Sequence, residues 1–192
     1  MQAFLISIAT VAIAETGDRT QLLALLLTAR FRQPWPILLG ILAATLANHA
    51  LAGALGAWLG RFLTPFLLDC TVGVSLVTMG LWMLKPDSPT SAPIDNSARG
   101  VFATTVIAFF LAEIGDKTQF TTMALAAAYP NLPAVIAGTT AGMLAANAPV
   151  VVLGNAFASR LPFRAINVGA ASLFMLLGLS FLARAVWSVP PS

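Results

Sequence analysis

The sequence predicts an all-α integral membrane protein with six transmembrane helices, arranged as two inverted three-helix repeats. Three observations lead to this fold class. Of the 192 residues, 58% are hydrophobic and only 9% are charged, whereas about 25% of the residues of an ordinary soluble domain are charged. Long apolar segments follow one another along the whole chain. A polar motif in the first of these segments also recurs in the fourth.

A helix needs about 20 mostly apolar residues to cross the bilayer core, and six segments meet this requirement. They cover about Ala3–Ala29, Trp35–Leu59, Pro65–Leu84, Val101–Ala128, Leu132–Ala158 and Phe163–Trp187. Residues 85–100 are instead rich in Pro, Ser, Asp and Asn, which is typical of a flexible linker. We therefore expect residues 1–84 to form one repeat, residues 85–100 a linker and residues 101–192 a second repeat.

The basic residues predict how the helices are oriented. They are scattered along the chain, so the net charge of +3 does not indicate nucleic-acid binding. The loops after the first, third and fifth segments carry Arg30, Arg32, Lys85, Arg99, Arg160 and Arg164, whereas the loops on the other side carry Arg61 and Arg184. By the positive-inside rule, the first set and the linker face the cytoplasm. Both termini are then non-cytoplasmic.

The internal repeat is the most informative pattern in the chain. The motif AETGDRTQ, which ends at Gln21, recurs as AEIGDKTQ, which ends at Gln119, 98 residues later. Asn48 and Asn147 occupy matching places in the helices that follow, and Gly80 aligns with Gly178. Because each copy has an odd number of helices, the second must enter the membrane from the opposite side. Such inverted repeats bring corresponding motifs together near the bilayer centre.

The two motifs hold four of the seven acids in the chain, namely Glu15, Asp18, Glu113 and Asp116. An ionised acid at membrane depth costs at least about 2.5 kcal/mol, so these side chains are expected to face a partner or a wet cavity. On a continuous helix, Glu15, Asp18 and Gln21 lie along one stripe. The second motif repeats this stripe, and the four acids are therefore candidate metal ligands.

Other residues of the two repeats could complete an ion site with further oxygen atoms. These candidates for ligands or supporting groups are Thr20, Gln21, Asn48, Thr118, Gln119 and Asn147. Gly17 and Gly115 permit local unwinding that would free backbone carbonyls. A set of oxygen donors without thiolates selects hard dications such as Ca²⁺, Mn²⁺ or Mg²⁺. For the two asparagines, an interhelical hydrogen bond is the alternative role.

The charges of the motifs favour exchange of a dication for protons. Four acids and two bases, Arg19 and Lys117, sum to about minus two, which one dication would neutralise. After its release the carboxylates would repel one another, and this repulsion favours proton uptake. The alternative is a structural clamp, with Arg19 paired to Glu15 and Lys117 to Glu113, four residues apart on one helix. That clamp would leave both aspartates without partners, so we interpret the bases mainly as counter-charges of the empty site.

The duplicated E-x-G-D-(K/R)-(T/S) signature, with a linker between two three-helix units, resembles the MneA-type manganese exporters. It is equally similar to the GDT-type cation/proton antiporters of the Golgi. The resemblance covers nearly the whole chain and implies that Glu15, Asp18, Glu113 and Asp116 bind the transported ion. It also implies that the cargo is Mn²⁺ or, as in some relatives, Ca²⁺, and that a short bacterial-looking form exports it across the inner membrane.

We therefore expect a secondary transporter that exports Mn²⁺ in exchange for protons and needs no cofactor beyond its cargo. A Ca²⁺/H⁺ antiporter and a divalent-cation channel are alternatives, since rings of acids also line cation pores. An intramembrane enzyme is a further alternative, but His49 is the only histidine, so metalloprotease and Ser/His arrangements are absent. His49 could relay protons or simply pack. Lipids, dications and protons are the expected partners, and the sequence leaves the oligomeric state open.

Overall fold

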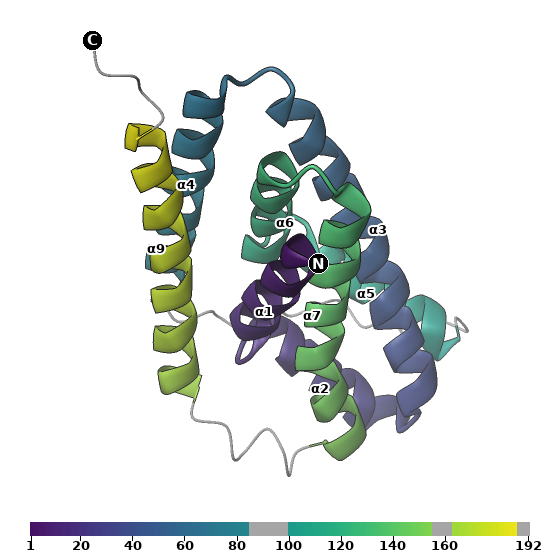
Figure 1. The fold of residues 1–192 in the computed structure, drawn as a ribbon. Helices are drawn as coiled ribbons and strands as arrows, with labels where there is room; N and C mark the ends of the chain where they lie inside the picture. Colours follow the sequence, from purple (N-terminus) through teal and green to yellow (C-terminus); the bar gives the residue numbers. More distant parts are fainter. Residues whose placement is uncertain (85–99, 155–162, 188–192) are drawn as a thin grey trace.

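The computed structural model describes residues 1–84, 100–154 and 163–187, which are drawn as coloured ribbons in Figure 1. These residues form helices joined by short turns, and none of them lies in a strand. The helices are α1 (Gln2–Glu15), α2 (Arg19–Phe31), α3 (Pro34–Gly60), α4 (Pro65–Met83), α5 (Val101–Glu113), α6 (Lys117–Ala128), α7 (Leu132–Leu153) and α9 (Phe163–Trp187). The predicted all-α class is thus confirmed.

Four of the six predicted segments correspond to single helices. α3, α4 and α9 follow their predicted ranges closely, because each range is a continuous apolar run between turn residues. α7 begins at Leu132 as expected and continues through Pro149, while the predicted end at Ala158 lies outside the described residues. The predicted linker also lies outside them, except for Gly100, which caps the start of α5.

The prediction of one continuous helix over Ala3–Ala29, and of another over Val101–Ala128, is wrong. The first segment breaks into α1 and α2, and the second breaks into α5 and α6, at the same place in each motif. Gly17 has φ of 89° and Gly115 has φ of 74°. L-residues with a side chain rarely adopt this left-handed region, whereas glycine does so freely. The motif glycines therefore end each helix and let a new one start in another direction.

Two of the described helices have the length of a membrane span, and several others are apolar but shorter. Among the described residues, α3 and α7 are each long and apolar enough to cross a membrane, and shorter apolar helices span Gln2–Glu15, Pro65–Leu81, Val101–Glu113 and Ala171–Trp187. Large apolar side chains such as Leu51 and Leu176 are 62% and 67% exposed. A surface with so many exposed apolar side chains suits contact with lipid rather than water.

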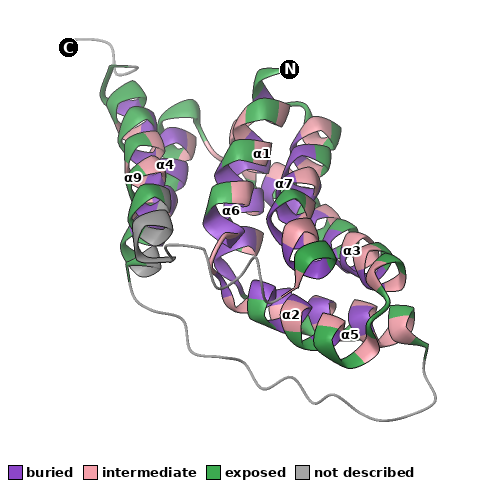
Figure 2. Cartoon of the chain, turned by 90° about the horizontal axis from the view of Figure 1, so that it is seen from below, coloured by how far each residue is buried: buried purple, intermediate pink, exposed green. Residues whose placement is uncertain are grey.

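The four short helices that begin or end at the breaks, which we call half-helices, are α1, α2, α5 and α6. They lie on two sides of the motifs, with α1 and α6 on one side and α2 and α5 on the other (Figure 2). α1 runs from Met1 to the centre, and α6 runs from the centre to the turn before α7. We call the outer end of this pair the Met1 face, and the space between it and the motifs the Met1 side. α2 and α5 lie beyond the motifs, and α2 ends at Phe31. Their outer end is called the Phe31 face, and the corresponding space the Phe31 side.

Equivalent glycine contacts hold the long helices against the half-helices. Gly138 of α7 lies against Ser7 of α1, and Gly40 of α3 lies against Thr105 of α5. A Cβ atom added at either glycine would come within 2.6 Å of the neighbouring helix. Small residues of this kind allow close helix approach in membranes. As a result, α7 lies along α1 and α3 lies along α5.

The helices α4 and α9 pack against each other and lie to one side of the others (Figure 1). Gly73 meets Gly178, and Gly80 meets Ala171, so the two helices approach closely at two points. They reach the remaining helices mainly through contacts of α4 with α6 and of α9 with α1. An apolar cluster that includes Leu76 lies at this interface, beside a cavity lined by Val72, Met79 and Ala124. A second apolar core fills the Phe31 side between α2, α3, α5 and α7.

Candidate metal centre

The two breaks have the same backbone structure. In the first, the side-chain Oε1 of Gln21 accepts a hydrogen bond of 2.8 Å from the N–H of Gly17. In the second, Oε1 of Gln119 accepts one of 2.9 Å from the N–H of Gly115. Each aspartate N–H donates to the carbonyl of the preceding motif glutamate at 3.1 Å. The glutamine of each motif therefore stabilises its loop, a role other than the ion ligand considered from the sequence.

The motif threonines orient the two glutamates. The hydroxyl of Thr20 donates to Oε2 of Glu15 at 2.6 Å, and the hydroxyl of Thr118 donates to Oε2 of Glu113 at 2.9 Å. Both glutamates are fully buried. The second oxygen of each, Oε1, has no hydrogen-bond partner among the described residues. A buried acceptor without a partner is costly, so each glutamate has one oxygen positioned and another available to a ligand.

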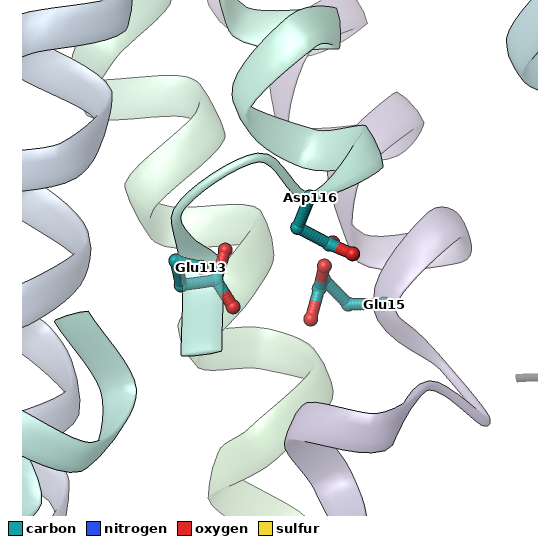
Figure 3. Close-up of side chains that lie close together, drawn as sticks. All are labelled: Glu15, Glu113 and Asp116. Carbon is teal, nitrogen blue, oxygen red and sulfur yellow. The ribbon is translucent and has the colours of Figure 1, made fainter. Parts of the chain in front are cut away.

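Three carboxylates from the two breaks converge on one point. Glu15, Glu113 and Asp116 each place an oxygen within 4.8 Å of the others, and all three are buried. Figure 3 shows Glu15 facing Glu113 and Asp116 across the space between the two motifs. Asp18 is also buried, but it is not part of this group. The structure thus brings together three of the four acids that the motifs single out.

The basic residues pair across the two motifs, and the clamp within each helix that was considered as an alternative does not form. The guanidinium of Arg19 lies 2.8 Å from Oδ1 of Asp116. The ammonium of Lys117 forms the reciprocal ion pair with Asp18. Because each helix breaks just after its glutamate, the base four residues later no longer lies above that glutamate. The aspartates, which the clamp would have left without partners, are the residues that the bases neutralise.

The asparagines of α3 and α7 lie beside the breaks and differ in their bonding. Nδ2 of Asn48 donates to the carbonyl of Phe110 in α5 at 3.1 Å, whereas Nδ2 of Asn147 donates to Met143 in its own helix. Both side-chain carbonyl oxygens, Oδ1, are buried and have no hydrogen-bond partner among the described residues. Asn48 therefore makes the interhelical bond considered from the sequence. Both asparagines also keep an oxygen available to a ligand.

The net charge of the site resides on the two glutamates. Two cross-motif ion pairs neutralise Asp18 and Asp116, whereas the hydrogen bonds that Glu15 and Glu113 receive from described side chains come from hydroxyls. α1 and α5 end at these glutamates, and the C-terminal end of a helix carries a partial negative charge that also favours a cation. The donors present are oxygen atoms, which fit a hard dication as cargo.

His49 lies next to Asn48 in α3 but does not join the acidic group. Its side chain is fully buried, and neither ring nitrogen has a hydrogen-bond partner among the described residues. His49 is thus packed inside the bundle, as one of the two roles considered from the sequence requires, while the proton-relay role stays a hypothesis.

A helical membrane protein with buried carboxylates at the breaks of two helices has the design of an ion transporter. The chain belongs to the family described as divalent cation/proton antiporter GDT1, whose family model matches residues 3–91 and 101–188. The resemblance inferred from the duplicated motif is thereby confirmed. Membership of this family makes the chain an integral membrane protein that handles divalent cations and protons.

Two relatives match nearly the full length of the chain. A protein of Vibrio cholerae named "Putative manganese exporter" is 49% identical over 181 residues, which cover 94% of this chain and 90% of the relative. A GDT1-like protein of Synechocystis is 24% identical over 199 residues, covering 93% of this chain and 96% of the relative. No solved structure has significant similarity to the chain.

Proposed function

We propose that this protein exports Mn²⁺ from the cytoplasm in exchange for protons, and that Glu15, Asp18, Glu113 and Asp116 form its ion site. The observation that carries the proposal is the pair of uncompensated glutamates. Each is fully buried, comes from a different motif and lies in one oxygen cluster with Asp116. Two negative charges at this distance in a membrane interior require a dication or protons between them.

The cargo assignment rests on the donor chemistry and on the Vibrio cholerae relative, whose name describes a manganese exporter. Carboxylate, amide and hydroxyl oxygens suit Mn²⁺, and they also suit Ca²⁺. A Ca²⁺/H⁺ antiporter is therefore the second candidate. Oδ1 of Asn48 and of Asn147, which are buried and have no hydrogen-bond partner, are proposed to complete the ion shell.

Proton exchange follows from the way the charges are paired. With the dication bound, its charge balances Glu15 and Glu113. When the dication leaves, protons replace it on these carboxylates and remove their repulsion. Arg19 and Lys117 remain with the aspartates throughout, because each ion pair joins the two motifs. These bases act as fixed counter-charges, while the threonine hydroxyls hold the glutamates in position.

We further propose six membrane spans arranged as two inverted repeats, residues 1–84 and 101–192, with residues 85–100 as the linker. Matching breaks at Gly17 and Gly115, and matching contacts of Gly40 with Thr105 and of Gly138 with Ser7, support this architecture. The loop charges support a cytoplasmic Phe31 face with both termini on the other side. The Vibrio cholerae relative supports the bacterial inner membrane as the location.

Transport by the purified protein in liposomes tests the proposal. We expect Mn²⁺ to move against its gradient when an opposing proton gradient is imposed, and a pH-sensitive dye to report proton movement in the other direction. Glu15→Gln should abolish both signals while the protein still elutes as a folded species from a size-exclusion column. Movement of Mn²⁺ that is insensitive to the proton gradient would indicate a channel and contradict the proposal.

Two experiments separate the two cargo candidates. In liposomes, the rates of Mn²⁺ and Ca²⁺ transport are compared at equal concentration of the two ions. In a second experiment, cells that lack the protein are exposed to each metal. We expect these cells to accumulate Mn²⁺ and to become sensitive to added Mn²⁺. Sensitivity to Ca²⁺ alone would overturn the manganese assignment and favour the Ca²⁺/H⁺ antiporter.

A further inference from the structure

We propose that buried hydroxyl side chains on the Met1 side line the route by which the cation passes between the glutamates and the Met1 face. The inference rests on the proposed function, because it assigns a route to the ion that the glutamates bind. The starting observation is that the Met1 side buries more hydroxyl side chains than the Phe31 side, although the two motifs have nearly the same sequence.

The Met1 side buries many polar side chains. They are Ser7 of α1, His49 of α3, Thr121 and Thr122 of α6, and Thr139 and Thr140 of α7. Each of these residues is at most 5% exposed. α7 packs against α1, α3 and α6, so the polar side chains belong to helices that meet around one element. Hydroxyl residues are common where membrane helices pack, so the hydrogen bonding of these side chains decides what they add.

The Phe31 side is apolar at most of the corresponding positions. The counterparts of Thr121 and Thr122, 98 residues earlier, are Leu23 and Ala24, and both are buried. They belong to an apolar cluster that also contains Ile41 of α3 and Phe109 of α5. The two sides thus share a backbone plan but differ in degree. The Phe31 side is mainly apolar, although it buries the hydroxyls of Thr45 and Thr105. The Met1 side buries more hydroxyls, together with a smaller apolar cluster around Leu125 and Val135.

Ser7 and Thr105 show the difference at one matched pair of positions. Each lies against a glycine of the neighbouring long helix. The hydroxyl of Thr105 donates to the carbonyl of Val101 in its own helix at 2.8 Å, whereas the hydroxyl of Ser7 has no hydrogen-bond partner among the described residues. The hydroxyl of Thr140 likewise has none. Buried hydroxyls without partners are expected to be occupied in another state of the protein.

The positions of these hydroxyls suit a route better than a binding site. Ser7 precedes Glu15 by eight residues on α1, which is about 12 Å along the helix axis. Thr139 precedes Asn147 by the same number of residues on α7. Hydroxyl oxygens can replace part of the water around a hard cation but lack the charge to hold it. The acids bind the ion, and the hydroxyls provide its path to water.

Matched threonine substitutions test the proposal in transport assays. Thr121, Thr139 and Thr105 each donate to a carbonyl of their own helix, so Thr→Val removes the same kind of bond at all three. We expect Thr121→Val and Thr139→Val to lower the Mn²⁺ transport rate by about tenfold, as for loss of one buried polar contact. Thr105→Val should stay within about twofold, because the hydroxyl of Thr105 lies on the other side of the glutamates, off the proposed route. Equal effects of all three changes would overturn the proposal.

Cysteine accessibility supplies a second test that does not depend on activity. In a Cys70→Ser background, Ser7→Cys and Thr139→Cys are treated with a membrane-impermeant thiol reagent from the Met1 face, with Thr105→Cys as the control. We expect labelling at positions 7 and 139 that Mn²⁺ slows, and none at position 105. Absence of labelling at both test positions during transport would overturn the route.

The two proposals fail in different ways. If Glu15→Gln abolishes transport but Thr121→Val and Thr139→Val do not lower it, the route is wrong and the antiporter stands. If Glu15→Gln leaves proton-coupled transport intact, the proposed ion site is wrong, and the route that leads to it is wrong as well.

Discussion

The two motifs are nearly identical where they meet and differ one layer further out. At the centre, each has a glutamate held by a threonine and a loop held by a glutamine. One layer out, Gln21 also donates to the carbonyl of Ala146 in α7 at 2.7 Å, and its counterpart Gln119 is more exposed. The ion pairs differ as well, since Lys117 and Asp18 are more deeply buried than Arg19 and Asp116.

This contrast separates two requirements of a transporter. In the proposed function the ion takes ligands from both motifs, which would constrain the central residues alike in each copy. The two membrane faces present different conditions to the protein, so the surrounding residues are free to diverge. Substitutions at matched positions of the two motifs can therefore show which residues have the same effect on transport or stability in both motifs and which do not.

The largest effect is expected at the glutamates, where the motifs should behave equally. Glu15→Gln and Glu113→Gln each remove one charge from the site and should lower the rate of Mn²⁺ transport by at least about 100-fold, since even indirect partners of metal ligands cost 10- to 100-fold. Transport in liposomes and Mn²⁺ affinity measured by calorimetry check this prediction. Near-normal Mn²⁺ binding by either variant would show that the centre is not shared.

The next largest effect is expected at the ion pairs, where the motifs should differ. Lys117→Met leaves a buried Asp18 without its ammonium partner, and loss of one member of a buried pair costs about 3–5 kcal/mol. Arg19→Met should cost less, because the Arg19 side chain is 26% exposed and water can reach it. Thermal unfolding in detergent compares the two variants. Equal destabilisation would contradict the difference in burial.

A smaller and again equal effect is expected at the motif glycines. Gly17→Ala and Gly115→Ala force a side chain into the left-handed region and should each cost about 1–2 kcal/mol of stability. Gly115→Asn is the matched control, since asparagine tolerates this conformation better and a Cβ atom at this position would contact nothing within 4 Å. Thermal unfolding again reports the result. Asparagine and alanine variants of equal stability would show that backbone strain is not the cause.

The smallest effect is expected at the glutamines. Gln21→Ala removes the loop bond and the bond to Ala146, whereas Gln119→Ala removes the loop bond alone among those described. The first should destabilise the protein more, by about 1 kcal/mol for the extra hydrogen bond. Unfolding curves of the two variants, measured side by side, check the order. If Gln21→Ala destabilises the protein no more than Gln119→Ala, the hydrogen bond from α2 to α7 contributes nothing to stability.

Much of the architecture could be predicted from the sequence, because apolar segment length and the repeated motif are properties of the chain itself. The starts and ends of α3 and α9 follow directly from proline, glycine and charged residues at their borders. The breaks after Glu15 and Glu113 could not be placed in the same way. Apolar residues continue on both sides of each motif, so the segment pattern resembles one long helix.

The pairing of charges was beyond sequence reasoning for the same reason. The spacing of Glu15 and Arg19 predicts a contact only if the helix is continuous, and the left-handed Gly17 removes that condition. The partner of Arg19 is Asp116, which lies 97 residues away, and a single sequence does not specify contacts of that range. Gly17 was the sequence feature that pointed to the break, because a glycine between Glu15 and Arg19 permits the helix to unwind there.

The crossed ion pairs make each repeat the electrostatic complement of the other. Asp18 is neutralised by Lys117 and Asp116 by Arg19, so neither repeat alone balances its own charges in the same way. A fragment of residues 1–84 inserted by itself would carry an arginine and an aspartate whose proper partners are missing. A change of charge at one of these positions therefore leaves an unpaired charge in the other half, and a compensating substitution must come from that half.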